Sequence, residues 1–191
     1  LLDFNAKYAL LRQYKDDWRR AVSVTYYGNM AFDPRSADNG AEVYNESDRL
    51  SFFHQLIVAR KFNNWLSFQV APSLSHYNLQ TDRGMENDHW AIAFGAQVKV
   101  TEVMSILVNV DQPLSQHDSR NPNPNVSLGL QMSTSSHAFQ IFIGNYDGMI
   151  PQENNMDYRY VDDTGNDDWN GFESFAQRFR IGFNITRLWN F

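Results

Sequence analysis

The sequence predicts an all-β fold: an antiparallel up-and-down transmembrane β-barrel with nine strands in this chain. Two observations carry this prediction, an alternation of short and long connections and an alternation of apolar and polar side chains. The short connections have two to four residues and lie at Lys15–Asp17, Asn63–Asn64, Thr101–Glu102 and Ser133–Ser136. The long, polar connections lie at Ala31–Asp48, Asn78–Asp88, Gln112–Asn125 and Asn145–Glu173. Tight turns at one rim and long loops at the other are typical of outer-membrane barrels.

Nine runs show the period of two that is typical of strands, although the third, Leu50–Phe62, is apolar on both faces. In chain order, the apolar positions of the others are Phe4, Ala6, Tyr8 and Leu10; Val22, Val24 and Tyr26; Leu66, Phe68 and Val70; Trp90, Ile92, Phe94, Ala96, Val98 and Val100; Met104, Ile106, Val108 and Val110; Val126, Leu128, Leu130 and Met132; Phe139, Ile141 and Ile143; and Phe179, Ile181, Phe183 and Ile185. The opposite parity is polar or small, as in Ala91, Ala93, Gly95, Gln97 and Lys99 of the fifth run. We expect the small residues either to widen a lumen or to let a neighbouring backbone or a plug approach.

Composition fits a single β domain over residues 1–191. Aromatic residues make up 15% of the chain, cysteine is absent, and no run approaches the 18 apolar residues of a membrane-spanning helix. The lack of cysteine removes disulfides, thiolate metal sites and cysteine nucleophiles. A soluble β-sandwich would show the same composition and alternation, so these two features do not distinguish it from a barrel.

Charge is sorted between the two kinds of connection. The four long loops carry 17 of the 22 acidic residues and only four of the 16 basic ones, which is a net charge of −13, while the rest of the chain carries +7. A sandwich has no evident reason to sort charge in this way. We therefore predict that the long loops face outward from the cell and the short turns face the periplasm.

The charged side chains within the runs take the polar parity, since a basic residue on the lipid face at mid-depth would cost about 2–4 kcal/mol. The predicted lumen-facing charges are Lys7, Lys99, Asp111, Arg178 and Arg180. The predicted interfacial aromatics at strand ends are Trp18, Trp65, Trp90 and Trp189, for which an ordinary core position is the alternative.

The final residue, Phe191, resembles the C-terminal assembly signal of bacterial outer-membrane barrels. If the last strand ends in the periplasm, an odd number of strands precedes the first one, because bacterial barrels have even strand numbers. One further strand gives ten and three give twelve. No signal peptide is visible, so we expect this sequence to be the C-terminal part of a longer precursor.

Several segments resemble a family of Bacteroidota outer-membrane β-barrel proteins catalogued only as a domain of unknown function. They span the whole chain: Lys7–Gln13, Asn87–Ala91, Asp111–Leu114, Ser133–Gln140 and Gly182–Arg187. Members of that family are longer at the N-terminus by roughly three strands, so the resemblance favours twelve. It implies no activity, cofactor or catalytic residue.

The loop Asn154–Glu173 is the most suggestive segment for metal chemistry. Its carboxylates could gather around Ca²⁺, although the spacing is not that of an EF-hand; they are Asp162, Asp163, Asp167 and Asp168. The alternative is a solvated acidic loop beside lipopolysaccharide. His76 and His89 flank one loop and could meet in space, either as an interfacial pair or as a metal site.

No catalytic constellation is evident, and we expect no cofactor beyond such a loop-bound calcium ion. Ser75 and His76 are adjacent on a strand and point to opposite faces, so they cannot form a nucleophile–base pair. The net charge of −6 and the absence of a basic patch argue against nucleic acid.

The expected function is that of a non-catalytic integral outer-membrane barrel, a structural or accessory subunit of an envelope complex. A narrow, porin-like, anion-preferring diffusion channel is the alternative, and an outer-membrane hydrolase is a third interpretation. The expected partners are outer-membrane lipid and lipopolysaccharide, with other outer-membrane proteins or lipoproteins.

Overall fold

The computed structural model of the chain is a nine-stranded antiparallel sheet in which each strand pairs with its neighbours in sequence. It describes residues 1–14, 17–34, 45–80, 85–118, 121–146, 148–156 and 180–187, without the side chain of Trp18. The elements are β1 (Leu2–Leu11), η1 (Trp18–Arg20), β2 (Ser23–Phe32), η2 (Glu46–Arg49), β3 (Leu50–Lys61), β4 (Leu66–Tyr77), β5 (Asp88–Lys99), β6 (Met104–Pro113), β7 (Asn125–Ser133), β8 (His137–Gly144), α1 (Pro151–Met156) and β9 (Arg180–Arg187). The predicted antiparallel meander is confirmed.

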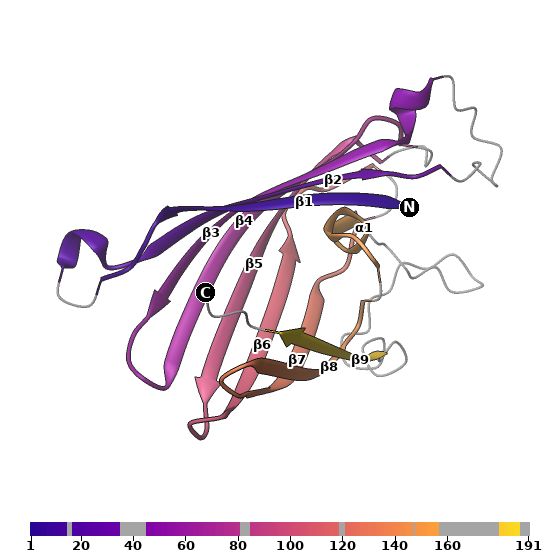
Figure 1. The fold of residues 1–191 in the computed structure, drawn as a ribbon. Coiled ribbons are helices and arrows are strands. Elements are labelled where there is room, and N and C mark those ends of the chain that lie inside the picture. Colours follow the sequence, from indigo (N-terminus) through magenta and orange to yellow (C-terminus); the bar gives the residue numbers. More distant parts are fainter. Residues whose placement is uncertain are drawn as a thin grey trace.

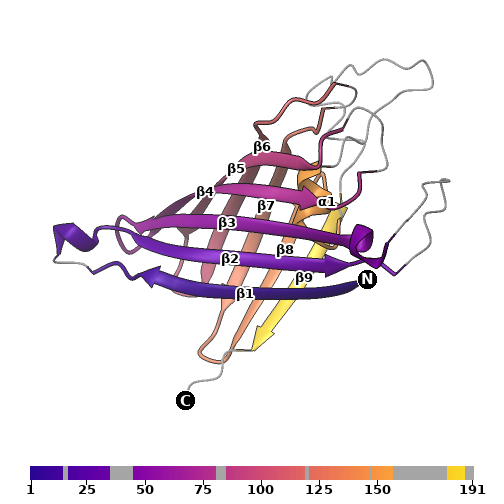
Figure 2. The same ribbon diagram turned by 90° about the horizontal axis from the view of Figure 1, so that it is seen from above.

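The sheet curls into an arc with β1 and β9 at its two edges, and α1 lies on the concave side (Figure 1). The view from above shows the same arrangement, with α1 near the ends of the strands that carry the long loops (Figure 2). Within the described residues, β1 pairs only with β2 and β9 only with β8. The two edges of the arc are therefore not joined to each other in the described part of the chain.

Short polar side chains shape three of the four predicted tight turns. Asn63 Oδ1 accepts hydrogen bonds from the backbone of Trp65 at 3.0 Å and Leu66 at 2.8 Å between β3 and β4. Thr101 does the same for the turn before β6, and Thr134 Oγ1 accepts from His137 N at 3.0 Å before β8. Such local bonds replace the strand ladder where the chain reverses. These connections have four, four and three residues between the strands, within the predicted two to four, although the first two extend one residue beyond Asn63–Asn64 and Thr101–Glu102 on each side.

The first connection is longer than the three residues predicted. Eleven residues separate Leu11 from Ser23, and they include the short helix η1, whose start is capped by Asp17. The Asp17 carboxylate accepts a hydrogen bond from Arg19 N at 3.0 Å. The prediction was wrong here because Asp17 acts as a helix N-cap rather than as a turn residue.

Two strands also reach farther into the predicted loops. β2 continues to Phe32 and β6 to Pro113, because Ala31 pairs with Asp3 and Ser51, and Gln112 pairs with Ile92. The predicted last loop contains the helix α1, which the sequence pattern did not indicate.

The apolar parity of the strands lies on the convex face, as the alternation predicts. Large apolar side chains are exposed there, including Phe94 at 37%, Ile141 at 59% and Phe183 at 78%. The opposite parity of β5 is buried at Ala91, at 1% exposure, and at Ala93. A contiguous apolar surface of this extent is what a lipid-facing sheet requires and what a soluble monomer avoids.

Pro72 lies inside the central strand β4, where proline is unusual. The β3–β4 ladder pairs Gln55 with Ser73 and resumes at Val58 with Val70, so pairing is interrupted beside the proline. Proline has no N–H to donate, which accounts for the gap. The ladder resumes in the same register, so both faces of β3 and β4 keep their side chains.

Candidate functional site

The concave wall at the long-loop end of the sheet holds the helix α1 through buried polar contacts. Gln152 Nε2 donates to Asn29 Oδ1 on β2 and to Ser51 Oγ on β3, both at 3.0 Å. One turn later, Asn155 Nδ2 lies 3.4 Å from Ser73 Oγ and from Ser75 Oγ on β4. Gln152 and Ser75 are each 0% exposed. The helix is thus fixed to three strands by side chains on one of its faces.

Small residues on the wall make room for the helix. Ala31, Ala71 and Ala91 are each 1% exposed, and serines 51, 73 and 75 supply the hydroxyls. Ala91 is one of the small inward residues predicted either to widen a lumen or to let another segment approach, and it is buried on a strand that α1 contacts. Met156 at 5% exposure and Ile150 at 3% add apolar contacts that close the packing around α1.

The segment between β8 and α1 is held by asparagine side chains. Gly148 N donates to Asn154 Oδ1 at 2.8 Å, while Asn154 O accepts from Asn125 Nδ2 at 2.7 Å. Asn145 bonds to both Val126 N and Pro124 O. Pro151 occupies the first helical position, where its missing N–H has no intrahelical partner to lose. These contacts fold the chain back over the concave face after β8.

His89 and His117 form a stacked pair next to α1, on the same wall. Their rings are 5.2 Å apart at 22°, with His89 Nδ1 3.0 Å from His117 Nε2. Glu86 N donates to His117 Nδ1 at 3.0 Å, so the proton of His117 lies on Nε2 and is donated to His89. The remaining proton of His89 is then on Nε2, which is buried without a partner among the described residues.

This arrangement of protons bears on whether His89 and His117 could bind a metal ion. Each ring nitrogen of the pair either carries a proton or accepts one, so neither ring offers a free lone pair in this arrangement. No group of three or more His, Cys, Asp or Glu side chains among the described residues could hold a metal ion. The calcium prediction at Asp162, Asp163, Asp167 and Asp168 lies outside the described residues.

The expected meeting of His76 and His89 is wrong. His76 Nδ1 lies 2.6 Å from the carboxylate of Asp88, its cross-strand partner, whereas His89 lies opposite Ser75. Neighbouring cross-strand pairs alternate between the faces of a sheet, so the two histidines are on opposite faces. Ser75 and His89 are close in register, but Ser75 Oγ accepts from Asn155 and His89 Nε2 has no partner in the described part of the chain, so these two residues form no nucleophile–base pair there.

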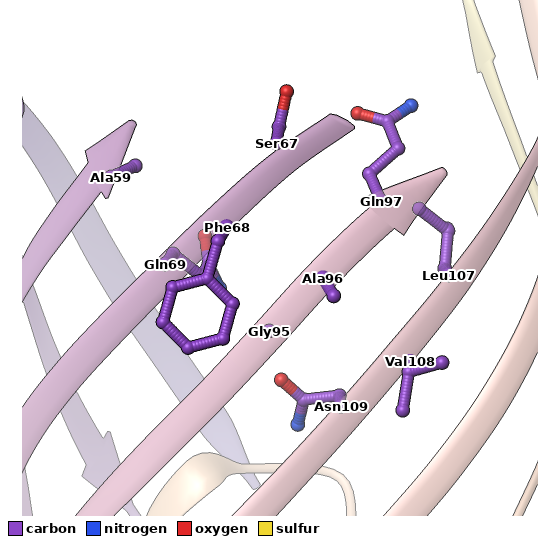
Figure 3. Close-up of a pocket in the computed structure, with 10 residues that line it drawn as sticks. All are labelled: Ala59, Ser67, Phe68, Gln69, Gly95, Ala96, Gln97, Leu107, Val108 and Asn109. Carbon is purple, nitrogen blue, oxygen red and sulfur yellow. The ribbon is translucent and has the colours of Figure 1, made fainter. Parts of the chain in front are cut away.

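Below α1, toward the short turns, the wall is lined by neutral amides. A groove of about 290 Å³ crosses β4, β5 and β6, and Figure 3 shows its side chains, with Gln69 beside Gly95. A second hollow of about 190 Å³ continues it over β7 and β8, since both are lined by Leu107 and Asn109. None of the described residues that line the groove or the second hollow is charged.

The predicted lumen-facing charges lie at the margins of this wall. Lys7 on β1 lies 5.1 Å from the centre of the Tyr27 ring, Lys99 is exposed at the short-turn end of β5, and Arg180 begins β9. Asp111 receives the Asn109 amide at 3.2 and 3.1 Å. Arg178 lies outside the described residues. The structure thus does not gather these charges into one cluster.

The structure describes the side chains of two of the four predicted interfacial tryptophans. Trp65 lies in the turn between β3 and β4, Trp90 lies near the long-loop end of β5, and each is 54% exposed. Trp18 begins η1, and its side chain is not among those described. Trp189 and Phe191 lie outside the described residues.

A polar pair on the convex face was not predicted from the sequence. His54 sits at an outward position of β3, and its Nδ1 lies 2.6 Å from Tyr26 Oη on β2. The Tyr26 ring covers Gly28, where a Cβ would meet the hydroxyl at 3.1 Å. A polar group on a lipid-facing surface needs such a partner. The third run, Leu50–Phe62, is apolar on both faces in the sequence, and this pattern gave no indication of the pair formed by His54 and Tyr26.

Together, the outward apolar face, the meander and the inward-folded helix define a membrane-embedded β-sheet protein with an occupied concave side. The chain belongs to the family described as "Membrane bound beta barrel domain (DUF5777)", whose model matches residues 1–189. Neither a curated protein nor a solved structure matches the chain. Among the described residues, no helix is long and apolar enough to cross a membrane.

Proposed function

We propose that this protein is a non-catalytic outer-membrane β-barrel, a structural or accessory subunit whose outer mouth is occupied by its own helix α1. The observation that carries the proposal is the docking of Gln152 and Asn155 onto serines and an asparagine of three strands. A fixed, hydrogen-bonded segment at the mouth opposes free diffusion. In this proposal the long loops face outside and the short turns face the periplasm.

Within the described residues, the outer edges of β1 and β9 have no strand beside them, which supports a barrel larger than nine strands. An unsatisfied backbone edge costs several kcal/mol per group in lipid, so only closed sheets span a membrane. An even strand number is usual in bacterial barrels, and we propose twelve or ten strands in the closed form. The lipid-facing surface would contact outer-membrane lipid and lipopolysaccharide, while the rims are available to other envelope proteins or lipoproteins.

A narrow, anion-preferring channel is the second candidate. The inward parity of Lys7 and Arg180, which lie on the two edge strands of the arc, favours it. Rings of basic side chains select anions. The neutral lining of the groove between these edges does not contribute to such a preference.

Conductance of the full-length protein in planar bilayers separates the two candidates. We expect the native protein to show little or no unitary conductance, and the double variant Gln152→Ala/Asn155→Ala to show stable openings, because it loses the side chains that anchor α1. Met149→Ala is the matched control, since Met149 lies in the same segment and is 82% exposed. Stable anion-selective openings of the native protein, weakened by Arg180→Glu or Arg178→Glu, would instead establish the channel.

The accessory role has its own test. Mild extraction from the membrane and purification through a tag should recover other envelope proteins in fixed stoichiometry. Recovery of the barrel alone, at native abundance and without crosslinked neighbours, would contradict a role in an envelope complex.

A further inference from the structure

We propose that the concave wall below α1 binds a neutral oligosaccharide through an amide tract, which consists of Gln69, Gln97, Asn109, Gln131 and Gln140. The tract crosses β4 to β8 and lies on the inward parity of each strand. This proposal does not depend on the closed mouth or on the accessory role proposed above. It concerns the half of the concave side nearer the short turns.

The register lines the amides up in three adjacent rows. One row pairs Gln69 with Gly95 and Gly95 with Asn109; the next pairs Ser67 with Gln97; a third pairs Gln131 with Gln140. Glycine at position 95 leaves room for the Gln69 side chain in the first row, because a Cβ there would lie 2.8 Å from Gln69 Cγ. The side chain of Gln69 therefore extends over Gly95, beside which Figure 3 labels it.

Several of these amides have unused hydrogen-bonding capacity. Gln69 and Gln97 make no side-chain hydrogen bond within the described part of the chain. Gln140 Nε2 donates to Gln131 Oε1 at 2.7 Å, and Gln131 Nε2 donates to Ser133 Oγ at 2.8 Å, so this pair is already oriented. An amide offers two donors and one acceptor oxygen, which matches the dual character of sugar hydroxyls.

The tract also has an apolar platform beside it. The Phe142 ring lies across Gly182, where a Cβ would be 2.6 Å from Phe142 Cε2, and it borders the same hollow as Gln140 and Tyr146. Tyr146 Oη donates to Ser127 Oγ at 3.2 Å. Burial raises the pKa of the Tyr146 phenol, so this donor keeps its proton at neutral pH. A ring face next to neutral polar groups suits the mixed C–H and O–H surface of a pyranose.

The lining discriminates against charged ligands. Among the described residues, neither hollow has a charged lining residue that could neutralise an ion taken out of water. Asp111, one row toward α1, already accepts two contacts from Asn109 and adds no positive charge. Lys99 lies in the row of Gln131 and Gln140, but it is exposed at the end of β5 and lines neither hollow. We therefore assign the tract to uncharged, polyhydroxylated ligands rather than to phosphates or acidic sugars.

Saturation-transfer NMR and calorimetric titration on the full-length protein test this assignment. The protein is held in a detergent without a sugar headgroup and titrated with maltohexaose, with oligogalacturonate of equal length as the charged counterpart. We expect maltohexaose to bind and oligogalacturonate to bind at least tenfold more weakly. The double variant Gln69→Ala/Gln97→Ala should weaken maltohexaose binding at least tenfold, because these two amides have no hydrogen-bond partner among the residues that the structure describes.

Gln55→Ala is the matched control, since Gln55 is an inward glutamine of β3 that lies outside both hollows. It should leave binding unchanged. The proposal is overturned if maltohexaose at millimolar concentration gives no signal, if the charged oligosaccharide binds equally well, or if the double variant and the control behave alike. Heat-modified migration on gels confirms that each variant is folded before it is titrated.

Discussion

His89 and His117 make the long-loop end of the concave wall sensitive to acid. In the observed pair each ring carries one proton, and every facing nitrogen has a defined role as donor or acceptor. A second proton on His89 Nδ1 would face the N–H of His117, and one on His117 Nδ1 would face the N–H of Glu86. Either event replaces an attraction by a repulsion.

We expect the segments around His89 and His117 to loosen as the pH falls from 7 to 5. An exposed histidine takes up a proton near pH 6.5, whereas a further proton on His89 Nδ1 in the closed pair would be opposed by the N–H of His117, so the open state is favoured below that pH. The contribution of the pair is present above that pH and is lost below it, by roughly 1–2 kcal/mol over this interval. Amide hydrogen exchange of residues 85–89 and 115–117 measures the opening.

Other titratable groups near the pair allow a control. Glu86, Asp88 and Asp118 are exposed, and Asp88 is bonded to His76 on the opposite face. His89→Gln should remove most of the pH dependence of exchange, whereas His76→Gln should keep it. Equal acid sensitivity in both variants would show that another group is responsible.

Among the elements, the packing between β8 and β9 depends on the large side chain of Phe142 and on the absence of a side chain at Gly182. Phe142 lies between Gly129 and Gly182 in the register, and its ring fills the space above Gly182. At Gly129 an added Cβ would lie 3.4 Å from Phe142 Cβ, which is ordinary contact. The two glycines therefore differ in the room that they leave.

Gly182→Ala should destabilise the protein by about 1–2 kcal/mol, because the Phe142 ring must leave its position. Gly129→Ala, the matched control, should change the free energy of unfolding by less than about 0.5 kcal/mol. Urea unfolding in micelles measures both. In a Phe142→Ala background the cost of Gly182→Ala should largely vanish; a cost that persists would mean that the backbone, not the ring, sets it.

The sequence predicted strands and faces well because each is a local property. The alternation in Trp90–Val100 and the turn residue Asn63 act over a few positions, and both are confirmed. The helix α1 was missed because it has six residues and its stability comes from contacts with β2, β3 and β4 that lie about a hundred residues away in sequence. Pro151 followed by polar amides was the one available signal.

The histidine pair and the amide tract were missed for a related reason. His89 and His117 meet because the loop after β6 folds back, which no spacing in the sequence encodes. The tract was visible as inward glutamines at Gln69, Gln97 and Gln131, but only the register shows that they form adjacent rows. The sequence indicated instead the charged residues Lys7, Lys99 and Asp111, which lie apart in the structure.

At the scale of the whole molecule, the central claim is that the strands cross the outer membrane with their long loops outside. The convex apolar face and the family support a membrane-bound barrel, and the sorted charge of the loops is the ground for the proposed orientation. The chain has no cysteine, so single cysteines can be introduced without background. Ser47 in the connection between β2 and β3 and Asn64 in the turn between β3 and β4 are both exposed and mark the two rims.

Labelling of single cysteines with a membrane-impermeant maleimide in intact cells tests this claim most directly. We predict that the Ser47→Cys variant of the full-length protein is labelled from outside, and that the Asn64→Cys variant is labelled only after the outer membrane is permeabilised. Labelling of Asn64→Cys in intact cells, with Ser47→Cys protected or labelled equally, would contradict the account.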